Sequence, residues 1–188
     1  MEYMKRVSLV VAVVMTLALA ASAGSISGKV SGVSGKSVVY VDTIAGKTFP
    51  APTQHPVMDQ KGLLFSPHIL VVEEGTTVDF LNSDNVQHNV FWPSIGGDKK
   101  AGHNLGTWPK GEKKSWKFDH PGAAPEMSGY IVVSPTPYFA ETDASGAFHI
   151  KDVPDGSYTV VAWHEGAKTQ SKPVTVKGDT TQDFTLTK

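Results

Sequence analysis

The sequence contains no cysteine among its 188 residues. A disulfide, a thiolate nucleophile, an iron–sulfur cluster and a thiolate ligand to a metal are therefore all excluded. Arginine is almost absent as well, because Arg6 is the one arginine in the sequence. With 17 basic and 18 acidic side chains, the formal net charge is −1. Without arginine or a surplus of cations, nucleic acid is not expected as a partner.

Long amphipathic helices are also missing from the pattern, since no stretch after the N-terminal apolar run keeps a 3.6-residue apolar period. The 18 glycines and 12 prolines favour short elements joined by many turns. Catalytic motifs such as G-x-S-x-G, H-E-x-x-H and a phosphate-binding glycine loop do not occur. A pair of carboxylates on separate strands leaves no sequence trace. We nevertheless predict an all-β protein that is not an enzyme.

The first 23 residues have the organisation of a secretory signal peptide. Two basic residues precede the apolar run Val7–Ala20, and the small residues Ala21–Ala23 follow it. A retained membrane anchor is the alternative, but Ser8 and Thr16 interrupt the run. The sequence therefore predicts that residues 1–23 are removed. The mature protein is then periplasmic or secreted, with no membrane segment.

The remainder of the chain shows a series of short strands. Apolar runs, several with a period of two residues, are separated by turn pairs such as Glu74-Gly75 and Ser145-Gly146. This spacing favours an antiparallel sandwich or barrel. The polar, glycine-rich segment Pro93–Asn104 is predicted to be a long loop. The predicted strands are Ile26–Val30, Ser37–Val41, Ile69–Val72, Thr77–Leu81, Ser115–Phe118, Gly129–Val133, Ala147–Ile150, Tyr158–Trp163, Val174–Val176 and Phe184–Leu186.

The two ends of the mature chain resemble one known family. Thr142–Ile150 and Asp152–Val160 follow the pattern T-D-x-x-G-x-F-x-I and then x-V-P-x-G-x-Y-x-V. This pattern is similar to carboxypeptidase regulatory-like (transthyretin-like) sandwich domains. Ile26–Val30 and Val38–Val41 look like the first strands of that family. The resemblance implies one sandwich made of residues 24–50 and 136–188, with the middle of the chain inserted in it or packed on it.

The middle of the chain resembles a second family. The segment Gly75–Asp84 follows the pattern G-x-x-V-x-F-x-N-x-D and leads into His88-Asn89-Val90. This arrangement is similar to cupredoxins, the blue-copper electron-transfer fold. The resemblance implies that residues 55–134 form a Greek-key barrel and that the family role is copper binding and electron transfer. It also implies a periplasmic redox protein as partner, with His88 as an equatorial and Met127 as an axial copper ligand.

The copper loop of this chain departs from the family pattern. A blue-copper centre uses two histidines, one cysteine thiolate and a weak axial methionine. Pro125 and Met127 are kept here, but Ala124 stands where the second histidine is expected and Pro121 where the cysteine is expected. Copper thus remains possible as a cofactor, at an incomplete site that cannot form a type 1 centre. The nearest further imidazoles by sequence are those of His103 and His120.

A metal-free interpretation stands beside the copper hypothesis. His88 could be a partly buried histidine that hydrogen-bonds a loop, and Met127 could fill the core. The alternative function is then a periplasmic or surface binding module for carbohydrate or protein. His68 is expected to be structural, and His164-Glu165 is a weak candidate metal pair. Trp92, next to the His88 segment, suggests an exposed docking surface.

Overall fold

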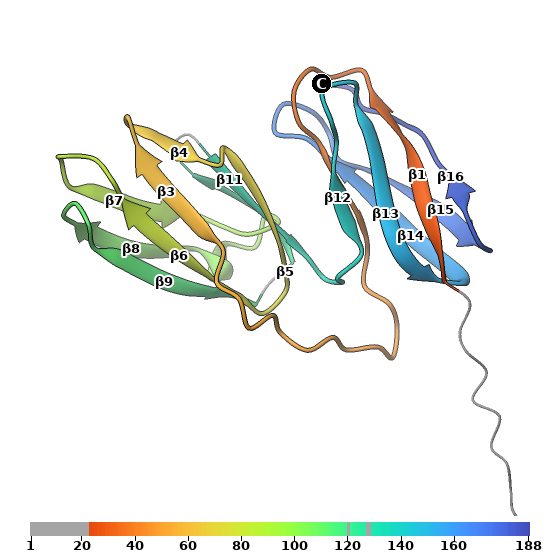
Figure 1. Cartoon of the computed structure of the whole chain (residues 1–188), viewed down its shortest axis with the longest axis horizontal. Coiled ribbons are helices and arrows are strands. Elements are labelled where there is room, and N and C mark those ends of the chain that lie inside the picture. The colour runs from red at the N-terminus through yellow and green to blue at the C-terminus, as the bar shows by residue number, and fades with distance from the viewer. Residues whose placement is uncertain (1–22, 120, 127–128) are drawn as a thin grey trace, which may run out of the picture.

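This computed structural model describes residues 23–119, 121–126 and 129–188, so almost all of the predicted signal peptide lies outside the described residues. Within the described residues the chain forms strands β1 to β17 and one short 3-10 helix, η1 (Lys99–Ala101) (Figure 1). None of the described helical segments is long and apolar enough to cross a membrane. The prediction of an all-β fold is confirmed.

Both ends of the chain together form a two-sheet sandwich. In the first sheet, β1 pairs with β13 on one side and with β16 and β17 on the other. In the second, the strand order is β12-β2-β14-β15. The bounds are β1 (Ala23–Ser31), β2 (Val38–Val41), β12 (Phe139–Glu141), β13 (Ala147–Pro154), β14 (Gly156–Trp163), β15 (Gln170–Val176), β16 (Thr180–Thr181) and β17 (Phe184–Thr185).

The pairing of the sandwich strands shows that the middle of the chain is an insertion. β1 lies antiparallel to β13, with Ile26 opposite Ile150, and both side chains are buried in the same core. β2 lies antiparallel to β12, with Tyr40 opposite Phe139. Strands on either side of the inserted segment are therefore direct neighbours. The chain leaves the sandwich after β2 and returns at β12.

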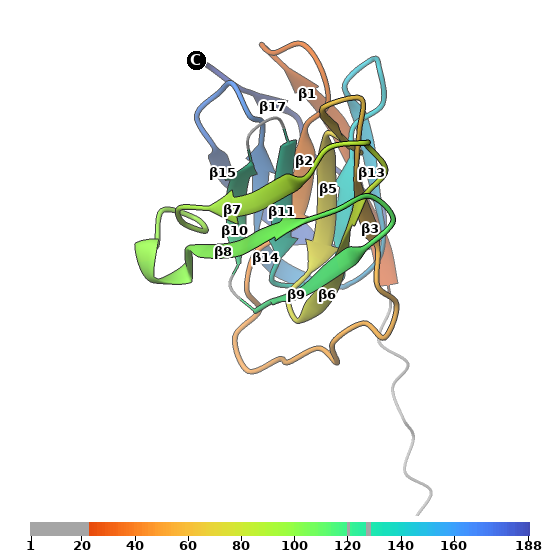
Figure 2. The same cartoon turned by 90° about the vertical axis from the view of Figure 1, so that its left-hand side faces the viewer.

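The inserted part, here called the barrel, consists of three sheets around one core. The strand orders are β4-β3-β6-β9, β10-β11-β5 and the ribbon β7-β8. Figure 2 shows β7 and β8 running side by side out to the loop that carries η1. The bounds are β3 (Val57–Lys61), β4 (Leu64–Ser66), β5 (Ile69–Glu73), β6 (Thr76–Asn82), β7 (His88–Trp92), β8 (His103–Trp108), β9 (Lys113–Phe118), β10 (Gly122–Glu126) and β11 (Gly129–Ser134).

Trp92 is a central residue of the barrel core rather than a docking residue. Its side chain is buried, its ring lies 5.1 Å from that of Phe118, and its Nε1 donates to the carbonyl of Ala101 at 2.9 Å. Alternation along β7 explains this burial, because Val90 and Trp92 face the core while Phe91 faces solvent. The expectation of an exposed surface at Trp92 is therefore wrong.

The sandwich and the barrel pack against each other through a small apolar interface. Val38 of the sandwich is buried with Ile69 and Val132 of the barrel. The rings of Tyr130 and Trp163 lie 5.3 Å apart at the same interface. Figure 1 shows β5 and β11 on the side of the barrel nearer to the sandwich. The interface therefore joins sheet β10-β11-β5 to the β2 and β14 side of the sandwich.

A tight turn leads into β13, as the sequence predicts. The Oδ1 atom of Asp143 accepts hydrogen bonds from the Ser145 amide at 2.8 Å and the Ala147 amide at 3.0 Å. The Ser145 hydroxyl, followed by these amides, lowers the pKa of Asp143. Gly146 completes the turn with a φ of +82°, a conformation that only glycine adopts without strain. After the turn, Phe148 and Ile150 point into the sandwich core.

Substitution of this glycine tests the turn. A Cβ atom on Gly146 would lie 2.4 Å from the carbonyl oxygen of Val30, whereas a Cβ atom on Gly46, at φ +72°, meets nothing within 4 Å. We expect Gly46→Ala to cost about 1 kcal/mol of unfolding free energy through backbone strain alone. Gly146→Ala should cost roughly 1–3 kcal/mol more through overpacking. Urea unfolding of both variants measures the difference, and equal costs would contradict the described packing of the turn on β1.

Candidate functional site at the His88 end of the barrel

The hairpin between β3 and β4 turns at Gly62 and Leu63, and both residues have a left-handed backbone. Their φ angles are +67° and +63°. Two successive residues with positive φ make a type I′ turn, which suits the twist of a hairpin. Glycine adopts this conformation freely, but for a leucine it costs roughly 1–2 kcal/mol. The turn therefore depends on interactions that hold Leu63 in place.

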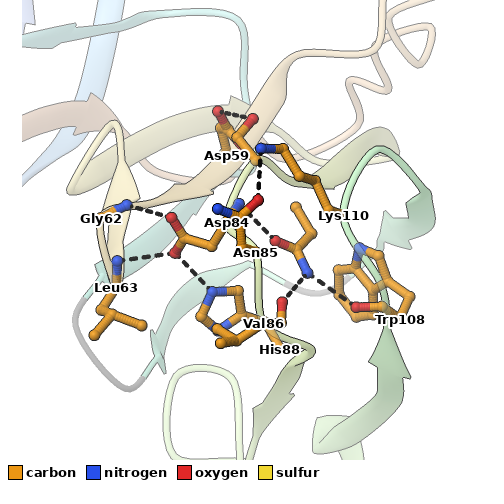
Figure 3. Close-up of polar contacts among 11 residues, drawn as sticks. Asp59, Gly62, Leu63, Asp84, Asn85, Val86, His88, Trp108 and Lys110 are labelled. Carbon is orange, nitrogen blue, oxygen red and sulfur yellow. Dashed lines mark hydrogen bonds and ion pairs between the residues drawn. The ribbon is translucent and has the colours of Figure 1, made fainter.

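The carboxylate of Asp84 supplies those interactions. Its Oδ1 accepts from the Gly62 amide at 2.6 Å, and its Oδ2 accepts from the Leu63 amide at 2.9 Å. The same Oδ2 lies 2.8 Å from Nε2 of His88 (Figure 3). One carboxylate therefore joins the β3–β4 turn to the first residue of β7.

These contacts fix the ionisation of Asp84 and the role of the imidazole. The pKa of Asp84 is lowered, first by the amide of Leu63 and then by the His88 and Gly62 hydrogen bonds. An ionised carboxylate can only accept hydrogen bonds, so Nε2 of His88 must carry the hydrogen that it donates. The side chain of His88 is 11% exposed. Within the described chain, its Nδ1 has no hydrogen-bond partner.

Further hydrogen bonds hold the loop between β6 and β7. The side-chain amide of Asn82 donates to the carbonyls of Val86 at 2.8 Å and Trp108 at 2.9 Å. The carbonyl oxygen of the same side chain accepts from the Asp84 amide at 2.9 Å. Lys110 donates to Asn85 across the neighbouring turn (Figure 3). The loop is thus tied both to β8 and to itself, which keeps Asp84 in position.

Three large apolar side chains are exposed at this end, beside the exposed polar residues Asn85 and Gln87. Leu63, Leu64 and Val86 are 70, 62 and 52% exposed. They lie on the two segments that Asp84 connects, namely the β3–β4 hairpin and the β6–β7 loop. We call these three residues the apolar rim. The site as a whole is therefore a rigid polar network with large hydrocarbon side chains turned to solvent.

The structure places only part of the sequence-predicted copper site. His88 lies at this end, whereas Met127 and His120 lie outside the described residues. His103 pairs with Trp92 at the far end of the β7–β8 ribbon, while His88 pairs with Trp108. Four residues of strand separate the two ends by roughly 13 Å. The His103 imidazole, which stacks on the ring of Trp116 at 3.5 Å, is thus not available to His88.

The donor atoms at this end do not fit a blue-copper centre. Such a centre needs a thiolate and two imidazoles, and the sequence has no cysteine. The described residues contain no group of three or more histidine, aspartate and glutamate side chains that could hold a metal ion. Asp84, the nearest charged donor to His88, is already bonded to two backbone amides. No described group of histidine, aspartate and glutamate side chains thus completes a metal site around His88.

His68 and His164 both have structural partners. His68 Nε2 lies 2.9 Å from a carboxylate oxygen of Glu165, which joins the barrel to the sandwich. His164 lies 3.1 Å from the carbonyl of Ser34 through Nε2 and accepts from the Gly166 amide through Nδ1. Both ring nitrogens of His164 are thus engaged, and Glu165 turns to His68 instead. The His164-Glu165 pair therefore does not form a metal site.

No role is predicted from the sequence for two parts of this site, Asp84 and the β3–β4 hairpin. Asp84 occurs in the cupredoxin-like pattern, but its partners lie about 20 residues earlier in the chain, where no local pattern links them to it. The β3–β4 hairpin does leave a signal, because Gly62 falls between two short strand-forming runs. The exposure of Leu63 has no such signal, since a leucine next to a glycine normally reads as a core residue.

The stability of the protein at acid pH tests the Asp84 network. A folded-state pKa below the usual 3.8 means that the ionised carboxylate stabilises the fold above about pH 4. This stability is lost as the pH falls through the folded-state pKa. We therefore expect Asp84→Asn to destabilise the protein at pH 7 and the difference from wild type to shrink steadily below pH 4. Urea unfolding measured from pH 7 to pH 3 gives this difference.

Asp152→Asn is the matched control. Asp152 is exposed and has no side-chain hydrogen bond to a described residue. We expect its substitution to change the unfolding free energy by less than about 0.5 kcal/mol. If Asp84→Asn also has no effect at pH 7, the carboxylate does not hold the turn. In the variant, a shift of the His88 ring resonances in NMR spectra would report the lost acceptor.

Comparisons with known proteins gave one family model and several similar solved structures. The family model of the carboxypeptidase regulatory-like domain matches residues 128–187. No curated protein matches the chain in sequence. A solved tryptophan-to-tyrosine mutant of amicyanin in its reduced form is 22% identical with a TM-score of 0.40, and the match covers 44% of this chain and 85% of that one.

Two further solved structures show the same likeness. A Cu(I) form of a methionine-to-alanine mutant of amicyanin is 22% identical with a TM-score of 0.40, and covers 53% of this chain and 100% of its own. A purple cupredoxin from Nitrosopumilus maritimus is 21% identical with a TM-score of 0.35, and covers 42% of this chain and 99% of its own. The chain is thus similar to a carboxypeptidase regulatory-like domain in its last third, and it has cupredoxins among its structural neighbours.

Proposed function

We propose that this chain is an exported interaction module that binds a partner protein through the apolar rim of its barrel. In this proposal the barrel keeps a cupredoxin-like framework but does not carry out one-electron transfer. His88 acts as part of the framework, because its Nε2 is held by Asp84. Export rests on the signal-peptide pattern of residues 1–23.

The observation that carries the proposal is the combination of strain and exposure at Leu63. This residue has a φ of +63° and is 70% exposed. A glycine would relieve the strain, and a polar residue would suit the solvent better. An exposed leucine that is kept at a cost in stability is typical of a functional surface. Leu64 and Val86 extend the same surface to more than one side chain.

The donor set argues against electron transfer as the role of this site. A blue-copper centre derives its covalency and its affinity for Cu(I) from the thiolate. Neither His88 nor the sequence around Pro121 and Ala124 supplies one. A partner that docks on hydrocarbon side chains needs no metal at all. The rim therefore supports binding more directly than the imidazole supports redox chemistry.

A copper-associated role is the second candidate, and one contact favours it. Metal-ligating histidines commonly donate their other ring nitrogen to a carboxylate, which orients the imidazole. His88 has this arrangement, with Nε2 bonded to Asp84 and Nδ1 without a partner in the described chain. Met127 would be the further ligand that the cupredoxin resemblance implies. A periplasmic redox protein would then be the partner.

Relieving the strain at Leu63 tests the proposed rim. Leu63→Gly should raise the unfolding free energy by about 1 kcal/mol, because glycine adopts the left-handed backbone without strain. The same variant should bind a partner less well, because the largest exposed hydrocarbon group of the rim is gone. A photo-crosslinking phenylalanine analogue at position 64, in the organism that produces the protein, measures the binding.

The crosslink needs a matched position and a matched variant. Val57 is 47% exposed and lies at the other end of β3, roughly 13 Å from the turn. We expect an adduct of one discrete mass from position 64 and none of that mass from position 57. Adding Leu63→Gly and Val86→Ser should reduce the adduct at least fivefold. The same adduct from both positions, or one that persists in the triple variant, would remove the rim as the binding surface.

A copper titration decides the second candidate. Purified mature protein is titrated with Cu(II) and with Cu(I) while its melting temperature and absorption spectrum are followed. The comparison is between wild type, His88→Ala and His149→Ala, the last of which removes an exposed histidine that bonds Ser27. If the apolar rim is the whole function, copper gives the same small response in all three proteins. A melting shift that only His88→Ala abolishes would establish copper binding at His88.

A further inference from the structure

A second candidate site lies where the barrel meets the segment that links it to the sandwich. The linker between β2 and β3 passes beneath the barrel (Figure 1) and encloses a cleft of about 340 Å³. The β5–β6 turn and the end of β9 form the opposite wall. The cleft is at the start of β6 and the His88 site is at its end, so about 20 Å of strand separates them. The two sites are therefore independent.

Charged side chains of both signs line this cleft, and Asp119 is a further carboxylate of its wall. Four others matter for the proposal. Lys47 comes from the linker, Lys117 from β9, and Glu73 and Glu74 from the β5–β6 turn. None of the four makes an ion pair with a described residue. Surface charges of opposite sign this near to one another normally pair or face bulk water. Here Lys47 and Lys117 are exposed, and all four residues line one cleft, so both signs of charge are available to a ligand.

Glu73 is the one of these four groups whose carboxyl is measurably affected by burial. It is partly buried, and burial raises the pKa of its carboxyl without a cation that offsets the effect. A desolvated carboxylate of this kind gains more from an incoming ammonium group than an exposed one does. Glu73 therefore marks the anionic end of the cleft.

An unpartnered hydroxyl lies beside Glu73. Thr76 is 3% exposed, and its Oγ1 has no hydrogen-bond partner among the described residues. It lines a neighbouring cleft of about 270 Å³, of which Glu73 also forms part of the wall. Buried polar atoms without partners are rare in folded proteins. The two clefts share Glu73 as a lining residue. A ligand at Glu73 is therefore close to the Thr76 hydroxyl, a further polar group.

We propose that this interdomain cleft binds a small zwitterion, an amino acid or a short peptide with free termini. The ammonium group pairs with Glu73 and Glu74, and the carboxylate group pairs with Lys117 and Lys47. The ring of Phe49 and the side chain of Ile44 contribute the apolar surface of the cleft. Because the lysines and glutamates do not reach each other, the ligand must span more than an ion-pair distance. This favours a peptide of two or three residues over a single amino acid, and the cleft volume suits that size.

Calorimetric titration of the full mature chain with triglycine tests the proposal. Diglycine and glycine test the expected preference for a longer peptide, and glucose represents a neutral, hydroxyl-rich ligand. We expect triglycine to bind with a dissociation constant in the micromolar to low millimolar range and to weaken as salt is raised. Glu73→Gln and Lys117→Gln should each weaken binding at least tenfold. Lys151→Gln, an exposed charge on β13 of the sandwich, should leave it unchanged.

Blocked peptides show which end of the ligand each residue contacts. N-acetyl triglycine lacks the ammonium group, so its weaker binding should no longer respond to Glu73→Gln. Triglycine amide lacks the carboxylate, so its binding should no longer respond to Lys117→Gln. Such paired losses arise only if each residue contacts the matching terminus. Melting temperatures within about 2 °C of wild type confirm that the variants fold, because neither side chain has a hydrogen-bond or ion-pair partner among the described residues.

Three results would overturn the proposal. The first is no heat and no NMR shift at Glu73 or Lys117 with any peptide up to 20 mM. The second is binding of glucose but not of triglycine, which would assign the cleft to neutral ligands. The third is triglycine binding that neither variant changes, which would place the peptide elsewhere. None of these outcomes affects the apolar rim, because its crosslink is measured at the other end of β6.

Discussion

β2 and β12 are neighbours in one sheet, so the inserted barrel must begin and end at the same place on the sandwich. The Val41 amide donates to the carbonyl of Tyr138 at 2.9 Å just where the barrel begins and ends. This pairing sets the position of the barrel, since both of its connections start from the same sheet. It also explains why the interface between the two parts needs only a few buried residues such as Val38, Ile69 and Val132. The covalent connections already hold the two surfaces close together.

Within the barrel, one carboxylate organises the end that carries the candidate site. Asp84 accepts hydrogen bonds from the adjacent amides of Gly62 and Leu63 and from the imidazole of His88, so it joins two separate segments of the chain. The imidazole of His88 is therefore a structural donor. The energetic cost of the arrangement falls on Leu63, whose backbone is strained and whose side chain meets solvent. Local rules of protein structure are broken at Leu63, and such violations concentrate at functional surfaces.

The sandwich could be predicted from the sequence because its signals are local. Asp143 and Gly146 are three residues apart, and together they specify the turn that leads Phe148 and Ile150 into the core. β7 is less readable, because Phe91 faces solvent between two buried apolar residues and so hides the alternation of a strand. The predicted long loop is accordingly shorter, since β8 already begins at His103.

The candidate site could be predicted only in part. The position of His88 at the start of a strand follows from the family-like pattern around it, but its partner does not. Asp84 is four residues away and could equally have faced solvent, since its orientation depends on a hairpin about 20 residues earlier. The interdomain cleft has no sequence signature at all, because Lys47, Glu73 and Lys117 meet only through the path of the linker. Contacts between distant segments are what a pattern along the chain cannot express.

The neighbouring exit and return points of the barrel also matter for how such a protein can evolve. Recombination at these two points could replace the barrel with a different inserted domain. The distance between the two connection points is set by the β2–β12 pairing and not by the inserted domain. Shortening a loop inside the inserted barrel would likewise leave the sandwich undisturbed. The inserted domain can therefore change during evolution while the sandwich keeps its fold.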